Sequence, residues 1–183
     1  MKKGLRGFTL LELLIVIGIL AILATTITLV LNPAEMLKQA RDSQRLGDLR
    51  SVHAAISMYA ATATSTDFAS CGTGCMNTGT TTSPFSAGPC TQPTVASSTK
   101  IDGTGWVSPL NLTKTSGGAA LSKLPLDPSS GSTYFYAFKC DAINSTWEIN
   151  GVLESTKYNN MMSNDGGNST STYEIGSDPD LNL

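Results

Sequence analysis

Arginine is absent from the C-terminal two-thirds of the sequence. Residues 61–183 carry five Lys and no Arg against ten Asp or Glu, whereas residues 1–50 carry seven Lys or Arg. Nucleic-acid binding needs clustered cations that contact phosphates. The acidic region therefore argues against a nucleic-acid partner, and a length of 183 residues leaves room for one folded domain.

Signatures of catalysis are also missing. The sequence has no nucleophile elbow, no Gly-Lys-Ser/Thr phosphate-binding loop and no pair of His ligands. Its one histidine, His53, stands beside Val52 on the apolar edge of a predicted helix, where a lone His is more often packed than catalytic. The sequence therefore gives no argument for an enzyme.

Cysteine is absent from the first 70 residues, and all four cysteines follow. They are Cys71, Cys75, Cys90 and Cys140. An even number confined to one part of the chain predicts disulfides in an oxidising compartment, with free cytosolic thiols as the alternative. Three full pairings are open. Cys140 ends a predicted strand while the others lie in one loop, so we favour a disulfide from Cys140 to that loop.

A long apolar segment opens the sequence. Residues 8–31 contain a single charged side chain, Glu12, and 24 residues form a helix ~36 Å long. The hydrocarbon core of a membrane is about 30 Å thick. A conventional signal peptide has a shorter apolar core, followed by a small-x-small cleavage site. We therefore expect a membrane anchor, and the cysteines favour a cytoplasmic N-terminus with the C-terminal part outside.

The start of this segment carries a specific motif. Gly7-Phe8-Thr9-Leu10-Leu11-Glu12, after a short basic leader, resembles the cleavage and methylation motif of type IV prepilins and type II secretion pseudopilins. The resemblance implies that a membrane peptidase cuts after Gly7 and that the same enzyme methylates the amine of Phe8. It also implies that Glu12 acts in filament assembly, where its carboxylate would compensate the α-amine of a neighbouring subunit at the same depth.

The same resemblance implies a structural role rather than a catalytic one. The expected function is that of a structural subunit of a type IV pilus-like or type II secretion pseudopilus filament. The implied partners are a prepilin peptidase/N-methyltransferase, copies of the chain, other pilin-like subunits and an inner-membrane assembly platform. The implied location is the inner membrane, followed by a filament at the cell surface or in the envelope. The alternative is a membrane-tethered extracellular adhesin or binding protein that does not polymerise.

The residues after the apolar segment predict a second helical stretch. Asn32-Pro33 interrupts the pattern, and Pro33 fits either the first residues of a second helix or a kink in one long helix. Residues 34–61 show helical spacing of apolar side chains, at Leu49, Val52, Ile56 and Tyr59. We expect the polar side to be solvated or to contact other subunits. It carries Lys38, Asp42, Arg45 and Asp48.

The predicted fold class is α+β, with a long N-terminal helix and a C-terminal antiparallel sheet of about three strands packed on it. The predicted strands are 134–140, 146–154 and 171–176, although Asn150-Gly151 could instead be a tight turn. The expected organisation is a leader at 1–7, a transmembrane/assembly helix at 8–31, an amphipathic helix at 32–61, a Ser/Thr/Gly-rich irregular segment at 62–133, and the sheet and C-terminal loop at 134–183.

A second motif precedes the predicted sheet. Asp127-Pro128, Gly131 and Tyr134-Phe135-Tyr136 resemble the D-P-x-x-G-x-x-Y-x-Y stretch of major pseudopilins, with Ser129 in place of the usual aromatic residue. The resemblance implies a C-terminal loop that binds calcium. Its oxygen ligands would be Asp165, Asp178 and Asp180. The alternative, which the residues themselves favour, is an acidic, Gly-rich solvent loop.

Overall fold

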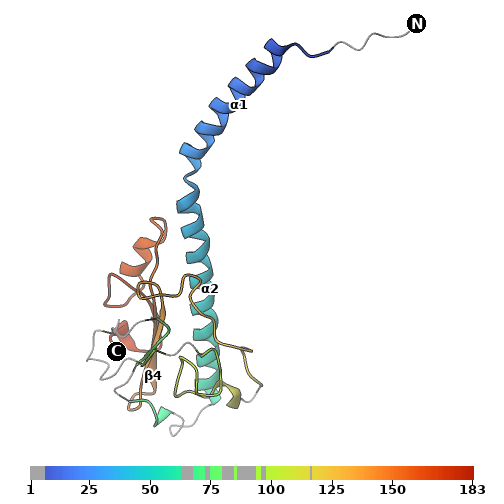
Figure 1. Ribbon diagram of the computed structural model, residues 1–183. Helices are drawn as coiled ribbons and strands as arrows, with labels where there is room; N and C mark the ends of the chain where they lie inside the picture. The colour runs from blue at the N-terminus through green and yellow to red at the C-terminus, as the bar shows by residue number, and fades with distance from the viewer. Residues whose placement is uncertain are drawn as a thin grey trace. The chain divides into compact units, whose positions relative to one another are not determined.

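The computed structural model describes residues 7–62, 68–72, 75–79, 85, 94–95, 98–115 and 117–183. The chain divides into two compact units, Met1–Leu37 and Lys38–Leu183. Six of the seven predicted leader residues lie outside the described part. Figure 1 shows the helices α1 and α2 and the strand β4 along the chain.

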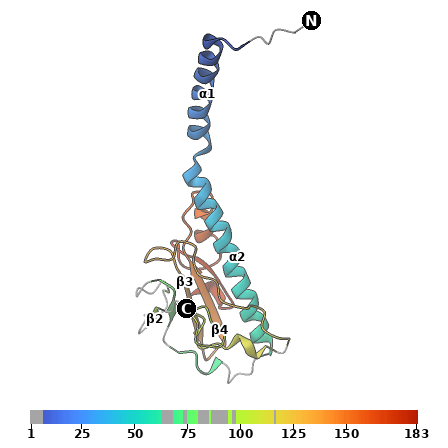
Figure 2. The same cartoon turned by 45° about the vertical axis from the view of Figure 1, so that its right-hand side comes forward.

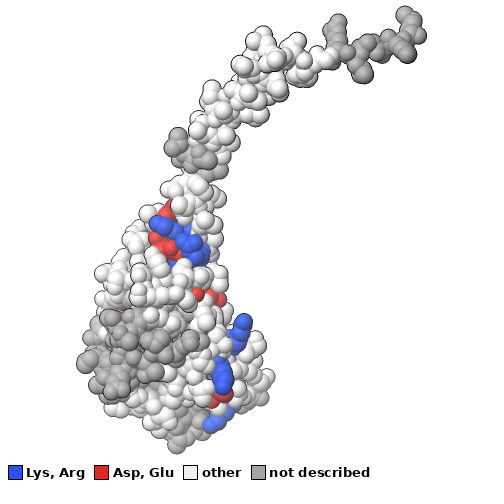
Figure 3. All heavy atoms as spheres, viewed as in Figure 1, with Lys and Arg blue, Asp and Glu red and all other residues white. Residues whose placement is uncertain are grey.

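Helix α1, Leu10–Leu31, forms most of the first unit. Its stretch Leu10–Ile27 is long and apolar enough to cross a membrane, and none of it is buried. The face visible in Figure 3 shows no charged side chain along this helix. The predicted apolar helix is therefore confirmed, with its first helical residue at Leu10 rather than Phe8.

The helical pattern breaks at Asn32. This residue has left-handed backbone geometry (φ 39°), and α2, Pro33–Thr62, starts directly after it. The carbonyl oxygen of Asn32 accepts hydrogen bonds from the N–H groups of Glu35 (3.0 Å) and Met36 (3.2 Å). Proline suits the first helical position because that residue's N–H would have no partner within the helix. Of the two predicted roles, Pro33 therefore has that of a helix start.

The second unit contains a five-stranded sheet in the order β2-β1-β3-β4-β5. The strands are β1 (Met76–Asn77), β2 (Thr94–Val95), β3 (Tyr136–Asp141), β4 (Thr146–Gly151) and β5 (Tyr173–Gly176). The predicted antiparallel arrangement is confirmed for β3, β4 and β5. The turn alternative at Asn150-Gly151 is wrong, because both residues pair with β3 and β5 inside the sheet. The two-residue strands β1 and β2 were not predicted.

One face of the sheet packs on α2, as Figures 1 and 2 show. The hydrophobic core joins the buried side of the helix to alternate residues of the strands. It includes Leu49, Val52, Ile56 and Tyr59 of α2 with Tyr136, Phe138, Trp147 and Ile149 of the sheet. Helix and sheet approach so closely that a Cβ on Gly151 would lie 2.8 Å from Leu49 Cδ1. The expected partnership between this helix face and the sheet is confirmed.

A disulfide between Cys71 and Cys140 ties the segment after α2 to strand β3. It closes a sequence separation of 69 residues and lies in the hydrophobic core near Phe68, whose ring is 6.2 Å from that of Trp147. Cys75 is also disulfide-bonded. Cys90 lies outside the described residues. The prediction of at least one disulfide is confirmed.

Candidate functional site

The predicted cleavage position lies outside regular secondary structure. Gly7, Phe8 and Thr9 precede the helix, and Thr9 has extended backbone geometry (φ −82°, ψ 152°). The side chain of Phe8 is 82% exposed, and a Cβ placed on Gly7 would meet no atom within 4 Å. A protease needs its substrate backbone accessible and not already bonded within a helix. The Gly7–Phe8 bond meets both conditions.

Glu12 and Thr9 form a capping box at the start of α1. The Oε2 atom of Glu12 accepts hydrogen bonds from the backbone N–H (2.9 Å) and the hydroxyl (2.8 Å) of Thr9. In return, Thr9 Oγ1 accepts a bond from the N–H of Glu12 at 3.3 Å. The first N–H groups of a helix have no partner within it, so this exchange satisfies two of them. The carboxylate of Glu12 is therefore held at the helix end.

Sequence reasoning missed this local role of Glu12, although the signal was present. Thr9-Leu10-Leu11-Glu12 has the S/T-x-x-E spacing that is typical of a capping box. Capping and a role between subunits are compatible, because both hydrogen bonds that Thr9 donates go to the same carboxylate oxygen, Oε2 of Glu12.

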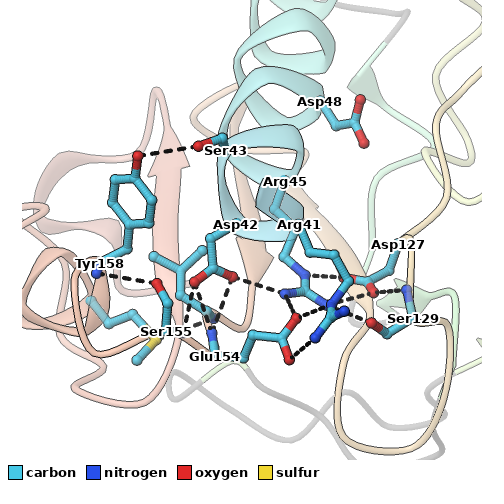
Figure 4. Close-up of polar contacts among 12 residues, drawn as sticks. Arg41, Asp42, Ser43, Arg45, Asp48, Asp127, Ser129, Glu154, Ser155 and Tyr158 are labelled. Atoms are coloured by element: carbon cyan, nitrogen blue, oxygen red, sulfur yellow. Dashed lines mark hydrogen bonds and ion pairs between the residues drawn. The ribbon is translucent and has the colours of Figure 1, made fainter. Parts of the chain in front are cut away.

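A second cluster of polar residues lies in the other unit, around the guanidinium group of Arg45 (Figure 4). Its Nε and Nη2 donate to the two oxygens of Asp127 at 2.7 and 3.0 Å. Nη1 donates to Asp42 and to Glu154, both at 2.8 Å, and Nη2 also donates to the hydroxyl of Ser129 at 3.1 Å. One buried side chain of α2 thereby binds residues from two distant parts of the chain.

Neighbouring residues of α2 complete the cluster. Arg41 donates from Nε and Nη2 to the two oxygens of Glu154 at 2.5 and 2.9 Å. The carboxylate of Asp42 accepts backbone N–H bonds from Glu154 (3.1 Å) and Ser155 (2.8 Å). Figure 4 shows these side chains pointing from the helix toward the segment after β4. We name the residues Arg41, Asp42, Arg45, Asp127 and Glu154 the Arg45 cluster.

The expectation of a solvated polar side on α2 is wrong for Asp42 and Arg45, because both are 0% exposed. Their positions continue the spacing of the apolar residues Leu49, Val52 and Ile56 toward the start of the helix. Extending the helical periodicity by two more positions would have placed them on the buried face. Because Asp42 and Arg45 are charged, they were assigned to the solvated side although their spacing places them on the buried side.

The motif that resembles pseudopilins converges on the same arginine. Asp127 binds the guanidinium, and its Oδ1 also accepts the N–H of Ser129 at 2.8 Å. The ring of Tyr134 lies under the Arg45 guanidinium carbon, which is 4.7 Å from the ring centroid. Ser129, which replaces the usual aromatic residue, accepts a hydrogen bond from Arg45 through its hydroxyl. The motif here supplies an anion, a hydroxyl and an aromatic face to one buried cation.

The arginines set the charge state of the cluster. Hydrogen bonds from Arg41, reinforced by those from Arg45, lower the pKa of Glu154 to about 2 against the opposing effect of burial. Nearby, the hydroxyl of Tyr136 donates to Asp48 Oδ2 at 2.9 Å, while burial raises the pKa of Asp48. Glu154 is therefore an anion throughout the neutral range and locks α2 to the end of the sheet.

The structure does not bring the predicted calcium ligands together. Among the described residues, no group of three or more His, Cys, Asp or Glu side chains could hold a metal ion. Asp165 accepts N–H bonds from Gly167 and Glu174, and Asp178 accepts bonds from the hydroxyl of Thr146 and from the N–H of Asn182. These two carboxylates connect their loops to the sheet, Asp165 through β5 and Asp178 through β4. They and Asp180 do not fit a preformed calcium site.

His53 packs against the ring of Trp147 and does not belong to either polar cluster. Its ring lies 6.0 Å from that of Trp147, and burial lowers its pKa. A neutral imidazole against a tryptophan ring belongs to the helix–sheet core, as its sequence position predicted.

The comparison with known families identifies the N-terminal segment. Residues 2–28 match the family model of the prokaryotic N-terminal methylation motif, the prepilin-type cleavage and methylation motif. This match covers Gly7, Phe8 and Glu12 as well as most of α1. No curated protein and no solved structure matches the chain.

Proposed function

We propose that this chain is the precursor of a structural filament subunit, of the pilin or pseudopilin kind, that polymerises through α1. A prepilin peptidase would cut between Gly7 and Phe8, and methylation of the new α-amine would follow. The observation that carries the proposal is the match of residues 2–28 to the methylation motif, which falls on an exposed apolar helix.

The placement of the cleavage position supports this processing. The Gly7–Phe8 bond lies before the first helical residue and is exposed, so a peptidase can bind it without unwinding α1. Cleavage also leaves Thr9 in the chain, so the capping box with Glu12 survives in the mature subunit. Processing therefore changes the charge at the N-terminus without removing the cap of the helix.

The exposed side chains of α1 support a role in assembly. Every side chain of this helix whose exposure is described is exposed, including large ones such as Leu14, Ile17 and Leu20. Lipid can cover such a surface in the membrane, and equivalent helices of other copies can cover it in a filament. The charge of Glu12 then needs compensation away from water, for which the α-amine of Phe8 on another copy is the proposed partner.

The folded unit that starts at Lys38 has the rigidity that a filament subunit requires. The Arg45 cluster, the Cys71–Cys140 disulfide and the helix–sheet core connect the part of α2 within this unit to the sheet and to the described segments around Cys71, Asp127 and Glu154. We propose that this unit faces the oxidising side of the membrane, where its disulfides form and persist.

Intact-mass analysis of the protein from its native membrane tests the processing step. The expected mass is that of a chain that starts at N-methylated Phe8. A mature chain that starts at Met1, or one cut after Ala24, would contradict the proposal. Imaging of filaments from cells that overproduce the protein tests polymerisation. A processed chain that never enters filaments would favour the membrane-tethered adhesin or binding protein.

A further inference from the structure

The face of the sheet that points away from α2 contains buried charges. Side chains alternate along a strand, so Trp147 and Ile149 of β4 join the helix-side core while Glu148 and Asn150 point to the opposite face. On β5, Glu174 shares that face and pairs in register with Asn150. Glu148, Asn150 and Glu174 are only 1%, 1% and 2% exposed.

Glu148 and Glu174 face each other as a carboxyl pair. Glu148 stands opposite Gly176 and Asn150 stands opposite Glu174, so the two Glu side chains are diagonal neighbours on one buried face of the sheet. Two anions in contact in a buried site repel each other, so the pair favours a single negative charge. Asn150 lies beside them, and within the described part of the chain its amide nitrogen and oxygen have no hydrogen-bond partner.

Two segments of the C-terminal region close over this pair. The N–H of Ser169 donates to Glu174 Oε2 at 2.8 Å, and the N–H of Leu183 donates to Glu148 Oε2 at 2.9 Å. At Gly167, a Cβ would lie only 2.1 Å from Glu174 Oε2, so the loop touches the carboxyl group with bare backbone. The loop 165–169 and the segment 177–183 are thus held down partly by these two side chains.

The charged groups around the pair come from several elements. Lys139 of β3 stands opposite Glu148 in the sheet and places a positive charge beside it. Asp141, on the same strand, interacts electrostatically with Lys139. Asp178 acts on Glu148, and Asp165 acts on Glu174, each as a further negative charge. A lysine on the same face and the lack of a third carboxylate ligand among the described residues favour a shared proton over a metal ion.

We propose that Glu148 and Glu174 share one proton and act as a pH-dependent latch that holds the loop 165–169 and the segment 177–183 on the sheet. When the proton leaves, both carboxylates are charged and repel each other in a buried site. Opening of the two segments then admits water to the pair and relieves the repulsion. The latch is closed in acid and loosens as the pH rises.

The direction follows from the two states of the pair. Burial, with the negative charge of Glu148, raises the pKa of Glu174 from its ordinary value of 4.5 to about 7. Between about pH 4.5 and pH 7, the pair therefore keeps its proton in the closed form and has lost it in the open form. Each pH unit within it favours opening by up to a factor of about ten, because one proton is released per opening.

Amide hydrogen exchange of the full chain in detergent micelles measures this opening. The N–H groups of Ser169 and Leu183, which donate to the pair, are the reporters. After correction for the intrinsic exchange rate, we expect their protection to fall by about a hundredfold between pH 5 and pH 7. Amides in the centre of α2 should show no such change over the same range.

Conservative variants separate titration from packing. Glu174→Gln and Glu148→Gln keep a carbonyl oxygen as acceptor and an N–H donor for the partner, but neither amide titrates. Each should make the protection of the reporters independent of pH, while Asp180→Asn, a change at an exposed carboxylate nearby, should leave the wild-type profile. A structural role alone would change the level of protection in the Gln variants without flattening the profile.

Two results would overturn the proposal. The first is wild-type protection that stays constant from pH 5 to pH 8, or a pH profile that persists in both Gln variants. The second is recovery of protection at pH 8 on addition of millimolar CaCl2 or MgCl2, which would assign the pair to a cation instead of a proton. Neither result depends on whether the chain forms filaments, so the test is separate from that of the proposed function.

Discussion

Arg45 and Asp127 form a two-pronged ion pair inside the protein, although 82 residues separate them in sequence. Both side chains are 0% exposed. The pair connects α2 to the loop before β3, and Glu154 extends the connection to the segment after β4. Helix α2 is thereby fixed to the segments around the sheet by ion pairs as well as by the apolar core.

Replacing Arg45 by Met tests the importance of this connection. Methionine has a similar length, but the change leaves the carboxylates of Asp42 and Asp127 buried without their cation. Breaking a buried ion pair on one side costs about 3–5 kcal/mol of unfolding free energy. Urea unfolding followed by the fluorescence of the buried residues Trp106 and Trp147 measures the loss.

Two further variants sharpen this measurement. Arg45→Lys keeps the charge but loses the fork geometry toward Asp127, so it should fall between wild type and Arg45→Met. Arg50→Met changes an exposed arginine of the same helix and should stay within about 0.5 kcal/mol of wild type. Equal effects of Arg45→Met and Arg50→Met would show that the cluster adds nothing to stability.

The lowered pKa of Glu154 predicts that the protein loses stability in acid. The pKa of Glu154 is lowered to about 2 in the folded protein, chiefly by hydrogen bonds from Arg41, from an ordinary value of 4.5. A lowered pKa gives stability that is fully present above the ordinary value and is lost as the pH falls toward the folded value. The contribution is about 3 kcal/mol at neutral pH, and it disappears between about pH 4.5 and pH 2.

Comparison of wild type with Glu154→Gln isolates that contribution. Unfolding free energies of the two proteins should differ most above pH 5 and converge toward pH 2. The pair Glu148–Glu174 has the opposite dependence, since its contribution declines between about pH 4.5 and pH 7. It is present in both proteins and cancels in the difference. A difference that does not shrink in acid would show that the charge of Glu154 is not what stabilises the fold.

The disulfide between Cys71 and Cys140 makes a separate prediction about stability. A cross-link over 69 residues restricts the unfolded chain by about 4 kcal/mol in the loop-entropy account. The double variant Cys71→Ala/Cys140→Ala should therefore unfold at a clearly lower urea concentration than wild type. In wild type, alkylation without reductant followed by mass analysis should leave both cysteines unlabelled. Four labelled thiols in the untreated protein would refute the pairing.

The helix and the main strands followed from local patterns. The 3-4 spacing of Leu49, Val52 and Ile56 predicted the buried face of α2, and alternation through Trp147 and Ile149 predicted β4. These patterns were sufficient because the spacing of apolar residues within one element shows which of its faces is buried. Strands β1 and β2 have two residues each, too few to show alternation. β1 pairs with the edge of β3, and β2 pairs in turn with β1, so both depend on partners that are distant in the sequence.

The buried charges could not be recognised in the same way. Asp42 and Arg45 look like solvent-facing residues until Asp127 and Glu154, far away in the sequence, neutralise them. Asp42 and Arg45 can be buried because these partners compensate their charge, and the sequence around α2 does not show which distant residues will do so. The carboxyl pair Glu148–Glu174 was hidden for the same reason, since alternation alone assigns these positions to a solvated face.

Glu12 provides the prediction that reaches furthest into function: its charge acts in assembly and not in membrane insertion. A 24-residue apolar segment with one Glu near its end should insert, and Glu12→Leu should insert at least as well. Cleavage should also persist, because the Gly7–Phe8 bond is unchanged. In the proposed filament, however, the α-amine of a neighbouring Phe8 would lose its counter-charge. An uncompensated buried charge costs several kcal/mol, and each 1.4 kcal/mol is a factor of ten in the assembly equilibrium.

The capping box allows the charge to be separated from the helix cap. Glu12→Gln removes the charge but keeps an oxygen that can accept the N–H of Thr9, whereas Thr9→Ala keeps the charge and removes the capping hydroxyl. If charge compensation drives assembly, Glu12→Gln should leave processed subunit in the membrane with few filaments, and Thr9→Ala should still polymerise. Glu12→Asp should be intermediate because its reach is shorter.

Filament counts and membrane-bound mature subunit, measured in the same cells, distinguish these outcomes. Normal filaments from both Glu12→Leu and Glu12→Gln would show that the carboxylate is dispensable. Failure of Thr9→Ala alongside a working Glu12→Gln would instead assign the role of Glu12 to the cap.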